Sequence, residues 1–219
     1  MGHVDDLTPI AQDYLKVIWS AIEWGDPPIT TKGLAARFAT TQANVSETMR
    51  RLDGQGLLTY QPYKPVTLTS LGESLAVAMV RRHRLLETYL AQALGYGWEE
   101  VHDEAERLEH AVSDVFLDRI DHLLGHPRID PHGDPIPGPD GDWTPQAGAI
   151  KLSHAEPGLY RVVRVADTDP EQLSRLRRQH LEPGSTLDVR AGLPPAILGT
   201  SSPTTIQAAD LDAVRVRPA

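Results

Sequence analysis

A stretch of 24 residues without hydrophobic periodicity, residues 125–148, divides this chain into two parts of different character. It is rich in Pro, Gly and Asp, which favour turns, and it indicates a linker or a long irregular connection. Before it, apolar residues recur at the three- and four-residue spacing of helices. After it, apolar and polar residues alternate as in strands, most clearly over residues 159–165. The chain is therefore expected to be mainly α with a small β-rich part.

The helical part contains an order of elements that is typical of DNA-binding proteins. Helices are predicted over residues 8–24, 30–38, 42–54, 70–93 and 99–124, and a β-hairpin over residues 57–69. Ile22, Val115 and Phe116 are expected on inner helix faces. Helix, short turn, helix and hairpin form a winged helix-turn-helix, in which the second helix enters the major groove and the hairpin contacts the backbone. The short strands that follow residue 148, with a helix inserted near residues 170–179, favour a small β-barrel.

The charge of the chain at first argues against a nucleic-acid partner. The 219 residues carry 21 Lys plus Arg and 30 Asp plus Glu, a net charge of -9, whereas DNA-binding proteins usually present a basic surface. The excess is local, however, because residues 99–142 contain 3 basic and 13 acidic residues, and residues 30–69 contain 5 basic and 2 acidic ones. The predicted winged helix is therefore basic, and acidity does not exclude DNA. The absence of Cys excludes disulfides and thiolate ligands.

The predicted recognition helix begins with short polar side chains that suit base edges and phosphates, and basic residues lie around it. The candidate DNA-binding residues are Lys32, Arg37, Thr41, Gln42, Asn44, Ser46, Glu47, Thr48, Arg50, Arg51 and Lys64. The alternative is the solvated polar surface of an ordinary helical domain.

A dense group of His and Glu indicates a metal site. His102, Glu106, Glu109 and His110 would share one face of the helix predicted over residues 99–124. His83 and Glu87 lie four residues apart on the preceding helix, and Asp13 is a further candidate. Carboxylates with imidazoles and no sulfur suit Mn²⁺ or Fe²⁺, with Zn²⁺ as an alternative. A solvated acidic helix face would show the same spacing, and the Glu-x-x-His step of di-iron bundles is absent.

The order of these segments closely resembles the diphtheria toxin repressor and manganese transport regulator family. The winged helix is followed by the segments 82–87, 101–110 and 131–138, in the order found in that family. The resemblance implies a DNA-binding domain over residues 1–72, a helical metal-binding and dimerisation domain over residues 73–142, and an SH3-like domain over residues 143–219. It also implies a metal-loaded homodimer that binds operator DNA and represses metal-uptake genes.

The resemblance further implies two metal ions per protomer. The first site would consist of Asp13, Glu106, Glu109 and His110. The second would consist of His83, Glu87 and His102, with Asp169 and Gln172 added from the C-terminal domain. Glu171 or Asp167 could serve in place of these last two.

Departures from the family pattern bear on the choice of metal. Iron-type members have Met and Cys where this chain has Asp13 and Glu106, whereas manganese-type members have the same acids. Mn²⁺ is therefore favoured over Fe²⁺. Short manganese-type members also carry an acid where this chain has Lys16, which favours a second site at His83, Glu87 and His102.

Two other classes of function compete with this one. A metal-dependent enzyme on the helical scaffold would turn over a small substrate and would not bind DNA. A helical interaction protein would bind no stoichiometric metal. The winged helix counts against both, so the expectation is a cytoplasmic regulator that is not an enzyme and has neither a membrane segment nor a small-molecule substrate.

Overall fold

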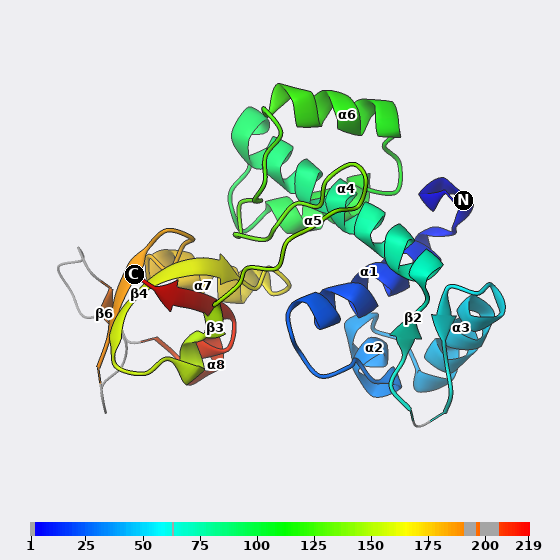
Figure 1. Ribbon diagram of the computed structural model, residues 1–219, viewed down its shortest axis with the longest axis horizontal. Coiled ribbons are helices and arrows are strands. Elements are labelled where there is room, and N and C mark those ends of the chain that lie inside the picture. Colours follow the sequence, from blue (N-terminus) through cyan, green and yellow to red (C-terminus); the bar gives the residue numbers. More distant parts are fainter. Residues whose placement is uncertain (1–2, 63, 191–195, 198–205) are drawn as a thin grey trace. The chain divides into compact units, whose positions relative to one another are not determined.

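The computed structural model describes residues 3–62, 64–190, 196–197 and 206–219. The chain forms two compact units, of which the first comprises Met1–His83 and Pro137–Trp143 and the second Arg84–Ile136 and Thr144–Ala219. The boundary between them falls within one continuous helix, α4 (Ser70–Leu94) (Figure 1). None of the helices in the described ranges is long and apolar enough to cross a membrane.

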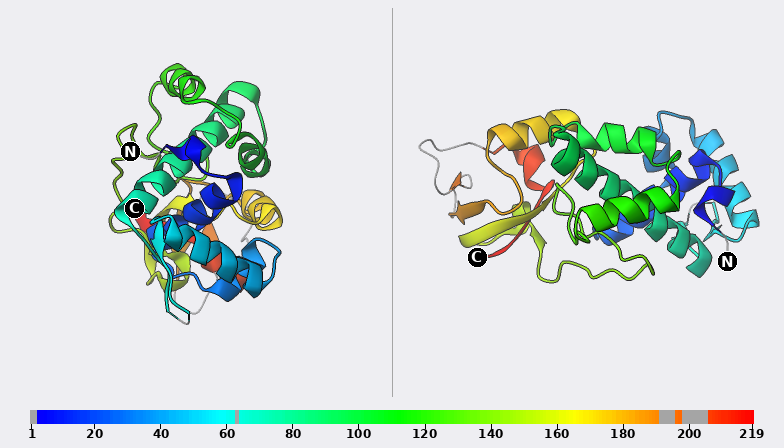
Figure 2. Two further views of the ribbon diagram at one scale, coloured as in Figure 1. Left: turned by 90° about the vertical axis from the view of Figure 1, so that its right-hand side faces the viewer. Right: turned by 90° about the horizontal axis from the view of Figure 1, so that it is seen from above.

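The first unit is a winged helix-turn-helix, as predicted. A short 3-10 helix, η1 (Val4–Asp6), precedes α1 (Pro9–Glu23), α2 (Thr31–Arg37) and α3 (Gln42–Gly54), which are blue to cyan in Figures 1 and 2. Each of the three α-helices begins after a Thr whose hydroxyl accepts a hydrogen bond from the backbone N–H three residues on; these are Thr8, Thr30 and Thr41. The wing is an antiparallel pair, β1 (Leu58–Thr59) and β2 (Thr67–Leu68).

The core of the first unit is built from the inner faces of these helices and the start of α4. Leu15, Ile18 and Trp19 of α1 are buried in it, as their spacing predicts. Trp19 meets the edge of Trp143 with ring centroids 5.1 Å apart. Ile22 was expected on the same face but is 52 % exposed, in the last turn of α1, which ends one residue later.

The helix predicted over residues 99–124 is in fact two helices, α5 (Val101–Leu108) and α6 (Asp114–Leu123). The hydroxyl of Ser113 accepts a hydrogen bond from the backbone N–H of Phe116 and so begins a new helix. The axis of α6 therefore differs from that of α5, and Val115 and Phe116 are exposed rather than in the core. Ile120 is buried, as expected.

The segment without periodicity is a packed loop rather than a mere linker. Residues 130, 132–134 and 136–138 of it are buried, and Ile129 forms a bridge with Pro135. Gly133 has a φ of +91°, and a Cβ at this position would overlap the carbonyl oxygen of Val163, so only glycine fits there. This loop, residues 129–136, lies against the C-terminal sheet within the second unit.

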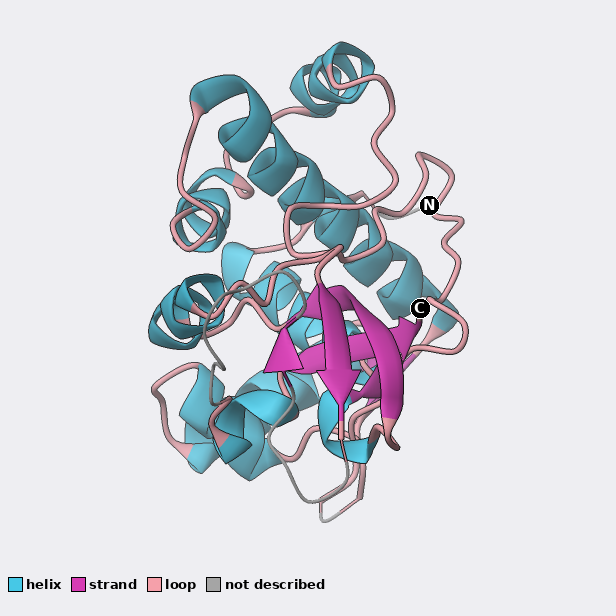
Figure 3. Cartoon of the chain, turned by 90° about the vertical axis from the view of Figure 1, so that its left-hand side faces the viewer, coloured by secondary structure: helices cyan, strands magenta, loops and turns pink. Residues whose placement is uncertain are grey.

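The C-terminal part of the second unit is a small antiparallel sheet (Figure 3). The strand order is β3-β7-β4-β5-β6. The strands are β3 (Ile150–Lys151), β4 (Gly158–Val165), β5 (Thr186–Val189), β6 (Ala196–Ile197) and β7 (Val214–Pro218). The other elements are the 3-10 helix η2 (Leu152–His154), α7 (Pro170–Arg178) and α8 (Ala208–Leu211). The expected strand ends at residues 198 and 205 lie outside the described residues. The β-rich C-terminal part is therefore confirmed, and its closure into a barrel stays a prediction.

Candidate metal centre and nucleic-acid interface

The predicted DNA-binding side chains lie mainly on the solvent side of the first unit. Nine of them are exposed, namely Lys32, Arg37, Thr41, Gln42, Asn44, Glu47, Arg50, Arg51 and Lys64. Thr41 caps α3 through the backbone N–H of Asn44, and the amide of Asn44 donates to the hydroxyl of Thr40 at 3.1 Å. These bonds order the N-terminal turn of α3 that is expected to face base edges.

Two of the predicted contact residues also hold the unit together. Ser46 and Thr48 are half-buried. The hydroxyl of Tyr60, which follows β1, donates to the hydroxyl of Ser46 at 3.2 Å and so connects α3 to the wing. Burial raises the pKa of Tyr14, although a hydrogen bond with Thr48 partly opposes this shift. The hydroxyls of Ser46 and Thr48 therefore already form hydrogen bonds within the protein.

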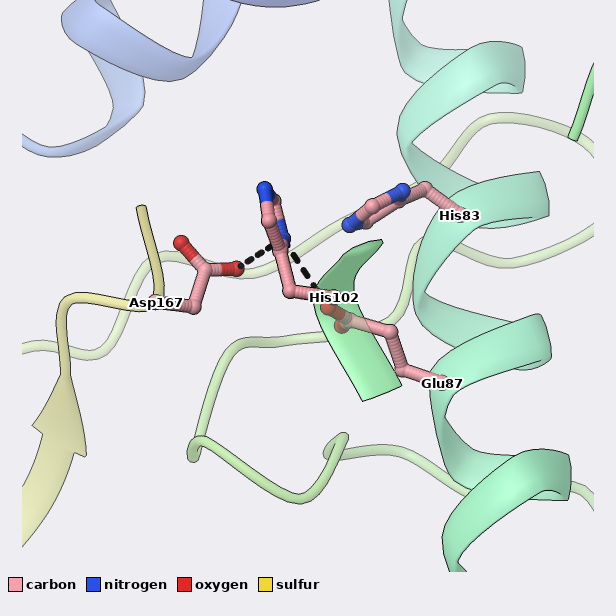
Figure 4. A group of neighbouring side chains, drawn as sticks. All are labelled: His83, Glu87, His102 and Asp167. Carbon is pink, nitrogen blue, oxygen red and sulfur yellow. Dashed lines mark hydrogen bonds and ion pairs between the residues drawn. The ribbon is translucent and has the colours of Figure 1, made fainter. Parts of the chain in front are cut away.

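Three candidate metal ligands meet inside the second unit. Glu87 lies on α4, His102 on α5, and Asp167 in the loop after β4 (Figure 4). Nδ1 of His102 lies 3.3 Å from a carboxylate oxygen of Glu87 and 3.3 Å from one of Asp167. Each of the three offers a ligand atom within 4.8 Å of the others. His83 lies on α4 one turn before Glu87, so the same helix presents both side chains.

The charges of this group fit a divalent cation. Burial opposes a charge on His102, but Asp167 and Glu87 together raise its pKa to about 11. Burial likewise opposes the charge on Asp167, and the attraction of His102 outweighs it and lowers the pKa of this carboxyl. In the metal-free protein the protonated imidazole of His102 therefore balances the charge of the two carboxylates. A divalent ion would take over this role, and His102 would release its proton. Two carboxylates and imidazole nitrogens form a donor set that suits Mn²⁺, Fe²⁺ or Zn²⁺.

The structure changes which C-terminal residue belongs to this group. Asp169, the position favoured by the sequence, caps α7 by accepting hydrogen bonds from the backbone N–H groups of Glu171 and Gln172. The side-chain amide of Gln172 donates to Asp210 at 3.0 Å. Asp167, the alternative position, is the one that lies beside His102. The structure therefore places Asp167 beside His102 and Asp169 at the helix terminus, and ligation by Asp169 and Gln172 stays a prediction.

The other predicted set is divided between the two units. Asp13 lies on α1 of the first unit, and Glu106, Glu109 and His110 lie in the second. Because α5 ends at Leu108, Glu109 and His110 are in the turn after the helix and not on one continuous helical face. Glu109 is fully buried, and its carboxylate lies 3.7 Å from Nε2 of His110. The association of Asp13 with these residues stays a prediction.

Sequence reasoning missed two buried residues beside Glu87. Asp130 and His132 come from the loop over residues 129–136, and each offers a ligand atom within 4.8 Å of the other and of Glu87. Their signal in the sequence is the Pro131-His132-Gly133-Asp134 motif, which supported the resemblance without a role for each residue. Burial and the charge of Glu87 raise the pKa of Asp130 to about 7.

Two family models match consecutive parts of this chain. A model described as the iron dependent repressor N-terminal DNA binding domain matches residues 6–66, and one described as the iron dependent repressor metal binding and dimerisation domain matches residues 69–138. The diphtheria toxin repressor of Corynebacterium efficiens is 34 % identical over 194 residues, which cover 84 % of each chain. The iron-dependent repressor IdeR of Mycobacterium leprae is 36 % identical over 135 residues, 62 % of this chain and 58 % of that protein.

Solved structures agree with this result over nearly the whole chain. A manganese-dependent transcriptional repressor in complex with manganese is 44 % identical, with a TM-score of 0.89, and covers 95 % of this chain and 100 % of that one.

Proposed function

Because this chain belongs to the iron-dependent repressor family, whose members are metal-dependent DNA-binding repressors and not enzymes, we propose that it is a repressor activated by Mn²⁺. It would act as a homodimer on operator DNA that controls metal-uptake genes. The observation that carries the proposal is the buried group of Glu87, His102 and Asp167, because its two carboxylates face an imidazolium that a divalent ion can replace.

The proposed metal content is two ions per protomer. One set, which the resemblance implies, is Asp13, Glu106, Glu109 and His110. The other is His83, Glu87 and His102, with Asp167, the alternative position, in place of Asp169 and Gln172. Carboxylates outnumber imidazoles in the first set and equal them in the second, and hard oxygen donors favour Mn²⁺. The similar repressor that was solved with manganese supports this choice. Fe²⁺ is the second candidate, because one relative and both family models are described as iron-dependent repressors.

The proposed DNA contact uses the exposed N-terminal part of α3 and the basic residues around it. In a homodimer, two such helices would read two half-sites of the operator. We assign the contact between protomers to α6, which lies in the region matched by the dimerisation domain model. The support is a row of exposed apolar side chains on this helix, Val115, Phe116 and Leu123.

Operator binding with and without metal tests the proposal. A binding site is first selected from random duplex DNA in the presence of Mn²⁺, and affinities are then measured at fixed salt for the wild type and Glu106→Ala. We expect Mn²⁺ to raise the affinity of the wild type by about 5- to 150-fold, the usual range of such coupling, and to have much less effect on the variant.

The control is Asp103→Ala, which removes an exposed acid from the same helix. It should respond to Mn²⁺ as the wild type does. Repeating the titration with Fe²⁺ and Zn²⁺ ranks the metals. Equal operator affinity for both proteins with and without metal would contradict the proposed function.

A further inference from the structure

The face of the C-terminal sheet that points away from its core carries basic side chains on neighbouring strands. Residues directly opposite each other in an antiparallel pair point to the same face. Arg161 of β4 is opposite Arg217 of β7. Lys151 of β3 is opposite Arg215 of β7, the red strand that lies between β3 and β4 in Figure 1. Arg215 and Arg217 are two residues apart on one strand, so these four side chains share one face, which we call the basic face.

The other face of the same strands belongs to the core. Val162 of β4 and Val216 of β7 are directly opposite each other and fully buried. The helix α7 contributes two buried leucines to the same core cluster, so it covers this inner face. Arg161 and Arg217 alternate with these valines along their strands and are exposed to solvent.

One arginine of β4 shows how the protein neutralises such a charge where it covers the sheet. After a β-bulge, Arg164 is opposite Arg215, but it is 5 % exposed. Asp134 of the loop over residues 129–136 forms an ion pair with it. At this end of the strand the protein therefore supplies an acid for the arginine.

The charges of the basic face are balanced less completely. Hydrogen bonding by a serine hydroxyl, and then the charges of Lys151 and Arg215, lower the pKa of Asp212, so this acid lies near one edge of the face. Within the described part of the chain, Arg161 and Arg217 form no ion pair with an acid. These two arginines therefore face each other across adjacent strands without a counter-charge.

The neighbouring strand on the other side does not supply the missing acid. Asp188 of β5 pairs with Arg190 at 2.6 Å, and the residue opposite Arg161 on β5 is Thr186. Like charges directly opposite each other destabilise a sheet. An anion with several charges, bound across the two strands, would remove this repulsion.

Duplex DNA is the polyanion that this face fits best. The chain belongs to a family of DNA-binding repressors, so DNA is already its partner. Phosphates of one DNA strand recur about every 3.4 Å along the helix axis, and neighbouring β-strands lie about 4.7–4.9 Å apart. The long side chains of two opposed arginines can therefore reach successive phosphates, and each guanidinium can bind a phosphate through two hydrogen bonds.

We propose that the basic face is a second DNA-binding surface, separate from the winged helix, which binds the phosphates of duplex DNA without regard to sequence. Arg161 and Arg217 carry the contact, and the hydroxyl of Thr186 is placed to donate a further hydrogen bond. The inference rests on the proposed function, because it takes DNA as the partner. It adds a contact that needs no metal ion.

The salt dependence of binding to DNA without an operator tests the proposal. Full-length protein is titrated in EDTA onto a fluorescent duplex of random sequence, at several low KCl concentrations, and the affinity is read from anisotropy. Each phosphate contact contributes about 0.9 to the slope of log affinity against log salt concentration. We expect Arg161→Ala and Arg217→Ala each to lower the slope by about 0.9, and the double variant to lower it by about 1.8.

Two further variants show whether the position of the charge matters. Arg178→Ala removes an exposed arginine from α7, which covers the inner face of the sheet, and should keep the slope of the wild type. Arg217→Lys keeps the charge on the basic face and should also keep the slope. An unchanged slope in the double variant would overturn the proposal. So would an equal decrease in Arg178→Ala, which would report net charge alone, or the absence of wild-type binding at the lowest salt concentration.

The same proteins separate this proposal from the proposed function. The double variant should retain the wild-type ratio of operator affinities with and without Mn²⁺. An operator affinity that responds to Mn²⁺, together with an unchanged salt slope in the double variant, removes only the second surface. A wild-type operator affinity that ignores Mn²⁺ contradicts the proposed function and leaves the slope as an independent result.

Folding and self-association are checked on the same samples. Because Arg161 and Arg217 are exposed and repel each other, we expect the double variant to melt at or above the temperature of the wild type. Analytical ultracentrifugation compares the association of copies of the chain. Weaker association of the double variant with an unchanged salt slope would assign the basic face to the acidic segment 99–142 of a second copy, and would overturn the proposed contact with DNA.

Discussion

Two buried carboxylates of the second unit are neutralised in different ways. Asp134 forms ion pairs with Arg84, at 3.3 Å, and with Arg164. Glu87 lies against two imidazoles, 3.3 Å from His102 and 3.8 Å from His132. Guanidinium groups keep their charge at any pH at which the protein is folded, whereas imidazolium groups can lose theirs.

The two groups therefore differ in whether their cations can be exchanged: the arginines around Asp134 are structural, whereas the imidazoles around Glu87 can lose their charge. The two arginines hold the loop over residues 129–136 to α4 and to β4, because Arg84 lies on the helix and Arg164 on the strand. The imidazoles beside Glu87 can release protons and become neutral nitrogen ligands. A metal ion can therefore replace the cations around Glu87 but not those around Asp134.

Removing an arginine should produce the largest effect. Arg164→Ala leaves Asp134 buried with only Arg84 as a partner, and breaking a buried ion pair in this way costs about 3–5 kcal/mol in the free energy of unfolding. The loss should be seen with and without Mn²⁺, because the arginine cluster is not a metal site. Chemical denaturation in EDTA and in Mn²⁺ measures it.

The control for this substitution is Arg161→Ala, on the same strand but exposed to solvent. It should change the free energy of unfolding by less than about 0.5 kcal/mol, as surface substitutions usually do. A loss for Arg164→Ala that disappears on addition of Mn²⁺ would contradict the distinction between the two clusters.

Between about pH 6.5 and 8.5, a smaller effect is expected in the pH dependence of the metal-free protein. Burial opposes the charge of His102, but Asp167 and Glu87 raise its pKa from 6.5 to about 11 in the folded state. This stabilisation is complete below pH 6.5, where His102 is protonated in both states, and declines toward pH 11 because unfolding then releases its proton. The decline is about 1.4 kcal/mol per pH unit.

Denaturation in EDTA between about pH 6.5 and 8.5 measures this slope. The wild type should lose stability relative to His102→Gln as the pH rises, since glutamine cannot take up the proton. Arg164→Ala should keep the slope of the wild type, because the guanidinium does not titrate in this range. Parallel curves for the wild type and His102→Gln would show that His102 is not charged in the metal-free protein.

Much of the scaffold followed from local sequence signals. The three- and four-residue spacing of apolar residues predicted α1 to α4, and the alternation of residues predicted β4. The break between α5 and α6 was not predicted, because the spacing of apolar residues continues through it. The local feature that ends one helix and begins the next is the hydrogen bond from the backbone N–H of Phe116 to the hydroxyl of Ser113, and the spacing of apolar residues does not reveal it.

The candidate site was predicted where its residues lie on helices and was missed where they lie in loops. Glu87 and His102 followed from helical spacing. Asp167 and Asp169 are two residues apart after the end of β4, and the sequence has no periodicity there to show which side chain turns inward. His132 is buried by Trp98, 34 residues away along the chain, and such a contact leaves no local signal.

The smallest effect on stability is expected for the substitution that distinguishes Asp169 from Asp167. Asp169→Ala removes the N-cap of α7 and should lower the free energy of unfolding by about 1 kcal/mol while leaving Mn²⁺ affinity unchanged. Asp167→Asn should lower Mn²⁺ affinity at least about tenfold, because it removes a charged neighbour of His102 from the metal group. Calorimetric titration with Mn²⁺ and thermal melting measure the two quantities. The reverse result, with metal affinity lost only in Asp169→Ala, would restore the assignment made from sequence and place Asp167 with the structural charges.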